Sequence, residues 1–414
     1  MKLLRFFTAG NVDDGKSTLI GRLLYDSKSI STDILETLTK QSKSAGFNTE
    51  IDLALLTDGL RAEREQGITI DVAYKYFTTD KRKFIIADTP GHAQYTRNMF
   101  TGASNTDLAI ILIDARNGIT EQTKRHSIIT GTLAIPHILI CVNKMDLVDF
   151  KEEVFEQIKK DYLAFAEPLG IKKISFIPVS ALAGDNVVNK SEKINWYKGT
   201  TLFDFLENVE IDHEETSKES RFQVQYVIRP QTDELHDYRG YAGSILSGTF
   251  RKGDKISIYP LDSQTTIEKI EKNGLEVHEA HAGEPIIIHL SDDLDVSRGS
   301  TILPFNQSIQ NDNNIEATIC WMDNKSFQNG QKLIFQQNSF TSKAVIKEVI
   351  GKINIHSYKV EEGEGQIQLN ELCKVHIKTA ENVSFDSYKH NRKTGAFILI
   401  NENTNNTVAA GVIL

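Results

Sequence analysis

Several features that would place this chain outside the ordinary globular proteins are missing from its sequence. Its first residues lack a basic start followed by an apolar core, which argues against a secretory leader. It also lacks any stretch of about 18 uninterrupted apolar residues, the length needed to span a membrane. We therefore expect a cytoplasmic protein with no membrane partner.

Cysteine is scarce as well. Cys141, Cys320 and Cys373 lie far apart, form no C-x-x-C pair, and each sits in an apolar, strand-like run. This pattern predicts buried thiols rather than a disulfide framework or a metal site. The 47 basic and 56 acidic residues give a net charge of −9, which argues against a strongly basic nucleic-acid binder but leaves localised patches open.

The first half of the chain alternates between two kinds of segment. Short apolar runs, "LLRFFTAG", "KFIIADTP", "DLAIILIDA", "HILICVNK" and "SFIPVSA", are separated by longer segments with a polar face. Continuous apolar runs of this kind are typical of buried parallel strands covered by helices on both faces. We expect a doubly wound α/β domain with a mostly parallel sheet over residues 1–212.

A polar, acidic stretch from Ile211 to Ser220 has no apolar periodicity and is expected to be a linker. After it the period changes to two, because Phe222, Val224, Tyr226 and Ile228 alternate with more polar neighbours, as in half-buried strands.

A second break, from Asn306 to Asn314, precedes another series of β-type runs. That series ends in "GAFILINENTNNTVAAGVIL", which predicts two strands joined by an Asn-rich hairpin turn. These patterns predict two β-barrel domains, at residues 220–306 and 312–414.

The stretch "GNVDDGKS" satisfies G-x-x-x-x-G-K-S/T and lies between an expected strand and an expected helix, where a phosphate-binding loop is found. In such a loop the backbone N–H groups surround the phosphates, the lysine reaches the β and γ oxygens, and the serine hydroxyl binds Mg²⁺. Because these groups supply the positive potential, the acidic side chains of the loop are free to face away from the phosphates. The predicted phosphate-binding residues are Gly10, Asn11, Val12, Asp13, Asp14, Gly15, Lys16, Ser17 and Thr18.

A second group of residues would surround the γ-phosphate. The run "IIADTPGH" places Asp88 at the end of a strand, where it can hold Mg²⁺ through water, and Thr69 lies where a switch threonine would join the metal shell. His92 is the predicted catalytic residue, orienting the attacking water. The predicted nucleotide contacts are Asp88, Thr89, Pro90, Gly91 and His92, and the predicted metal ligands are Ser17, Thr69 and Asp88.

A third group would read the base. The carboxylate of Asp146 can accept from the two adjacent donors that guanine offers and adenine does not, and a buried polar site of this kind can discriminate by roughly 10⁴ to 10⁵. We therefore predict GTP or GDP as the ligand. The predicted residues are Asn143, Lys144, Met145 and Asp146 of "CVNKMD" and Ser180, Ala181 and Leu182 of "VSAL".

The order of these motifs resembles the translation-factor-type GTPases. Within that class, "RFFTAGNVDDGKSTLIGRLLYDSKSI", "DGLRAEREQGITIDVAYKYF" and "DYRGYAGSILSG" are similar to the large GTPase subunits of heterodimeric bacterial sulfate adenylyltransferases. The resemblance implies an α/β P-loop GTPase domain followed by two β-barrels. It also implies that GTP hydrolysis drives ATP and sulfate to adenosine 5′-phosphosulfate and pyrophosphate. The adenylyl transfer would occur on a smaller partner subunit, and nucleic acid would not be a partner.

Asp13 falls at the aspartate of the translation-factor class, where it would order the loop or recruit a monovalent cation. Asp14 stands where carriers of aminoacyl-tRNA similar to elongation factor one-alpha usually have histidine, which favours the sulfate enzyme over that alternative. A GTP-dependent scaffold with no coupled reaction is the third possibility. Some relatives carry a fused adenylylsulfate kinase domain, and we expect no kinase activity in this chain.

Overall fold

The structure, a computed structural model, describes residues 2–28, 53, 69, 71–171, 173–211, 219–230, 237–355, 357–361 and 365–414. The chain divides into two compact units, Met1–Ile211 with Asn354–Lys359 and Asp212–Ile353 with Val360–Leu414. Most of the predicted linker, residues 212–218, lies outside the described residues. Residues 58–68, within the run that carries part of the family resemblance, lie outside them too.

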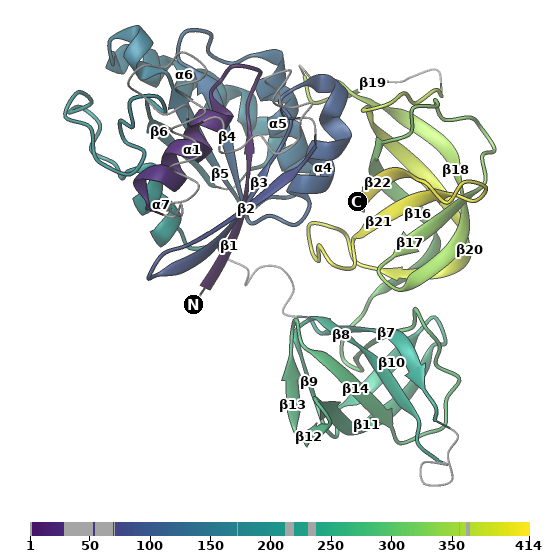
Figure 1. Cartoon of the computed structure of the whole chain (residues 1–414). Helices are drawn as coiled ribbons and strands as arrows, with labels where there is room; N and C mark the ends of the chain where they lie inside the picture. Colours follow the sequence, from purple (N-terminus) through teal and green to yellow (C-terminus); the bar gives the residue numbers. More distant parts are fainter. Residues whose placement is uncertain are drawn as a thin grey trace. The chain divides into compact units, whose positions relative to one another are not determined.

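The first unit is built on one six-stranded sheet in the order β2-β3-β1-β4-β5-β6 (Figure 1). All neighbouring pairs are parallel except β2 with β3, which is antiparallel. The mostly parallel sheet predicted from the apolar runs is therefore confirmed, whereas the edge strand β2 was not anticipated. The strands are β1 (Lys2–Ala9), β2 (Ala73–Thr78), β3 (Arg82–Asp88), β4 (Leu108–Asp114), β5 (His137–Asn143) and β6 (Lys173–Pro178).

Helices lie on both sides of this sheet (Figure 1), as a doubly wound fold requires. The longer helices connect successive parallel strands, because a parallel pair needs a crossover. The described helices are α1 (Lys16–Asp26), α4 (Thr96–Ala103), α5 (Glu121–Thr132), α6 (Glu152–Ala166) and α7 (Leu202–Asn208), with 3-10 turns η2 (Ala93–Tyr95), η3 (Met145–Val148) and η4 (Glu167–Leu169).

The central strand β4 explains why the sheet needs helices on both faces. Every residue of β4 is buried, so its side chains must be covered on either side. Leu108, Ile110 and Leu112 join the core cluster that includes residues of α1 and α7. The alternate residues of β4 point to the opposite face, where α5 contacts β4 and α4 contacts β1 and β3.

The second unit begins with an antiparallel sheet that closes on itself. Its strands run in the order β10-β15-β7-β8-β14-β11-β12, and an additional pairing of β10 with β11 closes six of them into a barrel. The strands of this region are β7 (Arg221–Ile228), β8 (Gly240–Ser247), β9 (Thr249–Arg251), β10 (Lys255–Tyr259), β11 (Ser263–Lys272), β12 (Leu275–Val277), β13 (Glu279–His281), β14 (Pro285–Leu290) and β15 (Thr301–Pro304).

The apolar positions predicted to face the core are buried only in the first half of β7. Phe222 and Val224 are buried in the barrel core as expected, but Tyr226 is 67% exposed. The register of β7 against β8 shifts between Val224 and Tyr226, which is a β-bulge, and such a bulge re-aims the side chains that follow it. The alternate residue Gln223 is also buried, because its side-chain oxygen accepts hydrogen bonds from Ser339 of the following barrel.

The second barrel of this unit closes in the same way. The order is β17-β21-β22-β16-β20-β18-β19, and β17 also pairs with β18. β16 begins at Gln310, so the predicted break at Asn306–Asn314 is wrong in its second half, where strand pairing with β20 overrides the polar composition. The strands are β16 (Gln310–Trp321), β17 (Leu333–Gln337), β18 (Phe340–Ile353), β19 (Val360–Glu361), β20 (Leu372–Phe385), β21 (Ala396–Asn401) and β22 (Thr407–Ile413).

The predicted Asn-rich hairpin between the last two strands is confirmed. β21 pairs antiparallel with β22, and the turn between them contains Asn405 at a φ of 56°, a conformation that asparagine tolerates well. The three cysteines are buried and free, which also confirms their interpretation. Burial raises the pKa of the Cys320 thiol to about 12, so this thiol stays protonated at neutral pH.

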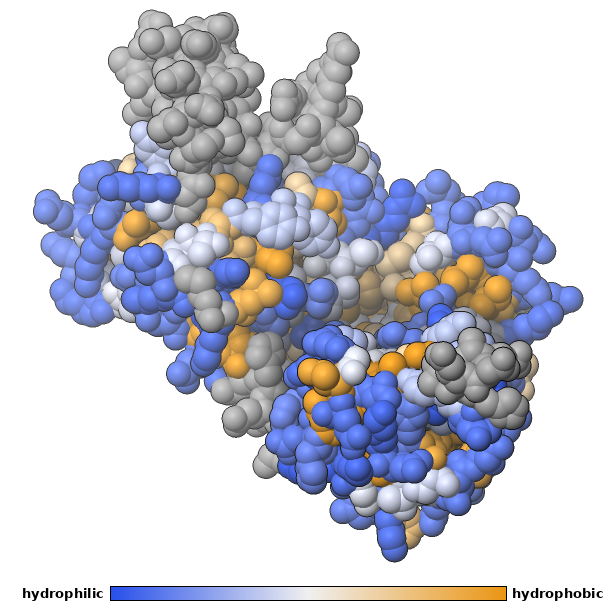
Figure 2. Space-filling view, turned by 60° about the horizontal axis from the view of Figure 1, so that its bottom comes forward, coloured by the Kyte–Doolittle hydropathy of each residue, from blue (hydrophilic) through white to orange (hydrophobic). Residues whose placement is uncertain are grey.

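The surface of the molecule is largely hydrophilic on the face that Figure 2 shows. On the face shown in Figure 2, hydrophilic residues dominate and hydrophobic residues form small groups between them. No helix among the described residues has the length and apolar character needed to cross a membrane.

Candidate nucleotide-binding site

The predicted motifs meet at one edge of the six-stranded sheet. The phosphate loop follows β1, Asp88 ends β3, Asn143 ends β5, and the "VSAL" segment follows β6. Because these strands are parallel, their carboxyl ends lie at the same edge, which is where ligands bind in doubly wound folds.

The phosphate loop leads directly into the amino terminus of α1. Gly15 has a φ of 91°, and a Cβ added there would lie 2.5 Å from the side-chain nitrogen of Asn143, so only glycine fits. No side-chain hydrogen bond caps this end of α1, within the loop that the structure describes. The first backbone N–H groups of the helix, together with its dipole, therefore favour an anion at this position.

Lys16 is folded back over the loop. Its ammonium nitrogen donates to the carbonyl oxygens of Gly10 and Asn11 at 3.0 and 3.1 Å. Burial lowers the pKa of Lys16, while the negative charges of Asp88 and Asp14 act in the opposite direction. A Cβ added to Gly91 would lie 2.6 Å from both Lys16 Nζ and Gly10 O, so the D-x-x-G turn packs directly against the phosphate loop.

The two adjacent aspartates of the loop behave differently. Asp13 is exposed at a φ of 65°, whereas Asp14 is only 3% exposed, and its carboxylate accepts the Asn11 N–H at 2.6 Å. Burial raises the pKa of Asp14 to about 6, although this hydrogen bond opposes the shift. The side chain of Asp14 therefore closes the loop on itself, while that of Asp13 is exposed.

Asp88 is held by the neighbouring strand. It lies opposite Thr8 in the register of β1 with β3, and the Thr8 hydroxyl donates to its carboxylate at 3.1 Å. The Thr89 hydroxyl in turn donates to the Thr8 carbonyl oxygen at 2.7 Å. These bonds fix a buried carboxylate whose charge reaches Lys16, so the side chain is suited to hold a hard cation beside a phosphate.

The two residues expected nearest the γ-phosphate are both described. His92 is half-buried, and its ring lies edge-on to Tyr95 with centroids 6.1 Å apart. Thr69 is half-buried, but residues 54–68 and 70 lie outside the described part of the chain. The catalytic role of His92 and the metal role of Thr69 remain predictions.

Asn143 connects the phosphate loop to the predicted base-reading segment. Its side-chain nitrogen donates to the carbonyl oxygen of Asp14 at 2.7 Å, and its side-chain oxygen accepts the Ala181 N–H at 2.9 Å. Both bonds are buried, so they are strong and geometrically fixed. Three sequence-predicted segments, 10–18, 143–146 and 180–182, are therefore joined by one amide group.

The other base-reading residues surround this amide. Met145 is buried and its N–H donates to Val179 O at 3.2 Å, while Asp146 is half-buried in the same 3-10 turn. Ser180 is buried and its hydroxyl accepts the Ala183 N–H at 3.3 Å, and Leu182 is largely exposed.

Asp114, at the end of β4, is a residue of this edge that the motif search missed. Arg116 donates to its carboxylate from the backbone N–H at 2.9 Å and from Nε and Nη2 at 3.0 and 2.7 Å, and Lys144 Nζ lies 2.9 Å away. Burial alone would raise the pKa of Asp114, but the bonds from Arg116 and Lys144 outweigh it and lower the pKa to about 2. The sequence did carry a signal for this residue. Asp114 is the carboxylate that ends the otherwise apolar strand β4, just as Asp88 ends β3.

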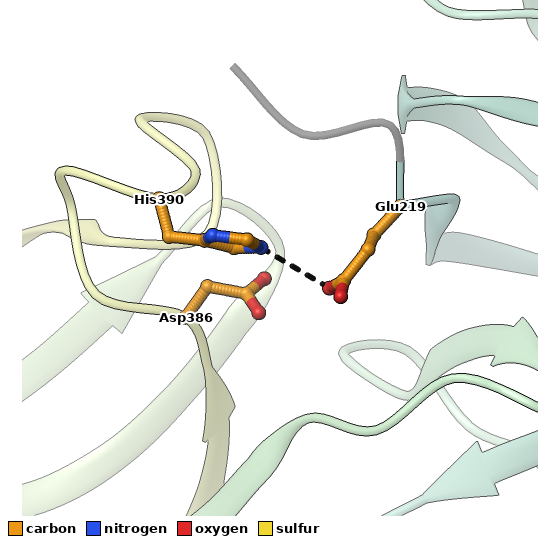
Figure 3. Close-up of side chains that lie close together, drawn as sticks. All are labelled: Glu219, Asp386 and His390. Carbon is orange, nitrogen blue, oxygen red and sulfur yellow. Dashed lines mark ion pairs between the residues drawn. The ribbon is translucent and has the colours of Figure 1, made fainter. Parts of the chain in front are cut away.

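The second unit contains a group of possible metal ligands, Glu219, Asp386 and His390, whose ligand atoms lie within 4.8 Å of one another (Figure 3). The carboxylate of Asp386 is already occupied, because Arg221 donates to it from Nε and Nη2 at 3.0 Å each. Arg221 is 0% exposed and also pairs with Glu219. A fully buried guanidinium at the centre disfavours a second cation, so this group is an ion-pair cluster between the two barrels.

The comparisons with known proteins agree with the geometry. Residues 1–216 match the family described as "Elongation factor Tu GTP binding domain", and residues 314–414 match "GTP-eEF1A C-terminal domain-like".

Three curated relatives are named "Sulfate adenylyltransferase subunit 1". They are from Cellvibrio japonicus (49% identical), Aliarcobacter butzleri (49%) and Bacteroides thetaiotaomicron (48%). Each alignment covers 100% of this chain and 86–87% of the relative.

The family resemblance inferred from the motifs is therefore confirmed, and so is the fold of a GTPase domain followed by two β-barrels. With a GTP-binding domain of the elongation factor Tu type and this level of identity over its full length, the chain belongs to the family of sulfate adenylyltransferase subunit 1 proteins.

Proposed function

We propose that this chain is the GTPase subunit of a sulfate adenylyltransferase and that its hydrolysis of GTP drives ATP and sulfate to adenosine 5′-phosphosulfate and pyrophosphate. The observation that carries the proposal is the pair of buried bonds made by Asn143, which ties a phosphate loop to a base-reading loop in a member of this family. We assign the GTPase to residues 1–212 and the barrels to 220–306 and 312–414.

The phosphate part of the site would work through positive potential. Backbone N–H groups at the start of α1 would hold the α- and β-phosphates, and Lys16 would exchange the carbonyls of Gly10 and Asn11 for phosphate oxygens. This exchange is chemically favourable, because a charged phosphate oxygen is a better acceptor for an ammonium group than a neutral carbonyl.

The base part of the site would select guanine. Asp146 would accept from the two adjacent donors of guanine, the Lys144 stem would cover the base, and the Ala181 segment would close the pocket. The orientation of this segment would depend on Asn143, because its side-chain oxygen holds the Ala181 N–H. Adenine offers no matching pair of donors, so ATP would be excluded.

The cation sites follow from the same residues. Ser17 at the start of α1 and the buried Asp88 supply the hard oxygen donors that Mg²⁺ prefers, with Thr69 as a further ligand. Bound Mg²⁺ would neutralise charge on the β- and γ-phosphates. Asp13, exposed beside Lys16, is the position that would attract a monovalent cation.

His92 would orient the attacking water, because it follows the D-x-x-G turn that packs against Lys16. GTPases of this kind are slow alone and gain roughly 10³- to 10⁵-fold when a partner completes the site. We therefore expect weak activity from the chain by itself and stronger activity with a smaller, adenylyl-transferring subunit in a heterodimer.

The decisive experiment mixes this chain with a sulfate-adenylylating small subunit and follows adenosine 5′-phosphosulfate from ATP and sulfate. GTP should increase the yield beyond the unassisted equilibrium, whereas GDP or a non-hydrolysable GTP analogue should not. A Lys16→Ala chain is the matched control and should behave as if GTP were absent. Synthesis that ignores GTP would contradict the proposal, and protection of aminoacyl-tRNA by this chain would favour the carrier alternative.

A further inference from the structure

We infer that Asp114 is a positioning residue for guanine recognition, because it holds the ammonium group of Lys144 and is itself held by Arg116. The inference rests on the proposed function, since it concerns the base-covering role of Lys144. It adds a residue to the site that belongs to none of the recognised motifs.

The backbone places Asp114 where it can act on the base-reading loop. In the parallel pairing of β4 with β5, Asp114 lies directly opposite Asn143, and the Ala115 N–H donates to the Asn143 carbonyl oxygen at 2.9 Å. The chain after Asp114 turns back, because Asn117 N–H and Gly118 N–H both donate to its carbonyl oxygen at 3.0 Å. The carboxylate is therefore on a rigid strand end, next to the first residue of "NKMD".

Lys144 needs such an anchor. It occupies the left-handed backbone region at a φ of 62°, which fixes the direction in which its side chain leaves the loop. A lysine side chain with a free ammonium end would sample many rotamers, and freezing them on nucleotide binding costs affinity. The ion pair with Asp114 at 2.9 Å holds the ammonium group before the base arrives, so the stem is already ordered.

Arg116 completes the arrangement. Its three donors on Asp114 fix the orientation of the carboxylate, so one oxygen remains directed toward Lys144. Asp114 therefore pairs with Arg116 at 2.7 Å and with Lys144 at 2.9 Å, at the same edge of the sheet as the predicted base-reading segment.

The test is a double-mutant cycle read as affinity for fluorescently labelled GDP. Asp114→Asn keeps the shape of the side chain and removes its charge, and it should weaken GDP binding about tenfold. Lys144→Met keeps a long apolar stem and removes the ammonium group. If Asp114 acts through Lys144, adding Asp114→Asn to Lys144→Met should change affinity less than about twofold.

Two readouts separate positioning from a general structural effect. Asp114→Asn should weaken GDP and IDP by the same factor, because the stem covers the face of either base and does not contact the 2-amino group that distinguishes them. Asp107→Asn, directly before the other end of the same strand, is the matched control and should leave GDP affinity unchanged. Thermal melting of each nucleotide-free variant would establish that it is folded.

The outcomes are distinguishable. The inference would be overturned if Asp114→Asn lowered GDP affinity equally in the unsubstituted chain and in the Lys144→Met chain, or lowered it in neither. The proposed function would remain intact in both cases. Failure of the unsubstituted chain to bind GDP would overturn the proposed function itself.

Discussion

The buried carboxylate of Asp14 predicts an unusual dependence of stability on pH. In the nucleotide-free chain, Asp14→Asn should stabilise the first unit, and the gain should grow as the pH rises. The amide keeps an oxygen that can accept the Asn11 N–H, but it cannot ionise. The substitution therefore removes the cost of a buried negative charge without removing the bond that closes the loop.

The sign and size of this pH dependence follow from the raised pKa of Asp14. The pKa of Asp14 is raised from 3.8 to about 6, so between these values the native state binds more protons than the unfolded state. The free energy of unfolding therefore falls as the pH rises through this window and levels off above it. At about 1.4 kcal/mol per pKa unit, ionisation of Asp14 costs about 1 kcal/mol at a pH of about 4.5 and about 3 kcal/mol at a pH of about 7.5.

The assay is urea unfolding of both chains at these two pH values. The sequence has 2 tryptophans, Trp196 in the first unit and Trp321 in the second, so a Trp321→Phe background makes fluorescence report the first unit. Trp196 is a suitable reporter, because its indole N–H donates to Phe150 O at 2.8 Å and its ring centroid lies 5.4 Å from that of Phe155. Comparing the two chains cancels the other titrating groups.

The expected result is a stability difference that favours Asp14→Asn and grows by about 2 kcal/mol from the lower to the higher pH. A difference independent of pH would refute the reasoning, because it would mean that Asp14 titrates normally. A difference that favours the unsubstituted chain at the higher pH would show that ionised Asp14 is stabilised by its neighbours more than burial penalises it.

Three further predictions concern other parts of the chain. Asp146→Asn should weaken GDP binding about 10²- to 10⁴-fold and improve binding of xanthosine diphosphate. The reason is that the amide presents a donor where guanine needs an acceptor. Unchanged GDP affinity in a nucleotide titration would contradict the assignment of Asp146 to base reading. Gly91→Ala should lower the GTPase rate about 100-fold, because the added Cβ would lie 2.6 Å from Lys16 Nζ and displace the D-x-x-G turn. A normal single-turnover rate would count against the packing of this turn on the phosphate loop. Asp386→Asn should lower the free energy of unfolding of the second unit by about 3–5 kcal/mol, because it leaves the buried Arg221 underpaired. The exposed His390→Gln should change it by less than about 1 kcal/mol. Both are measured by urea unfolding followed through the fluorescence of Trp321, which lies in the second unit.

The sequence by itself determined the elements that depend on local pattern. Apolar runs located five strands of the first unit, and their continuous hydrophobicity indicated a parallel sheet covered on both faces. The order of short motifs identified the family, because each motif combines a fixed spacing with side chains that phosphate or base chemistry requires. The buried cysteines and the final hairpin also followed from composition and turn chemistry.

Only the tertiary structure decided the features that depend on register between distant segments. Asp114 lies beside Lys144 because β4 pairs with β5 in one particular register, and Asn143 reaches Asp14 across 129 residues of sequence. Tyr226 turns outward because of a bulge that no alternation pattern reveals. Burial and long-range hydrogen bonds are properties of the assembled fold, so the chain's residue types could locate the site but could not show that Asp14 closes its own loop.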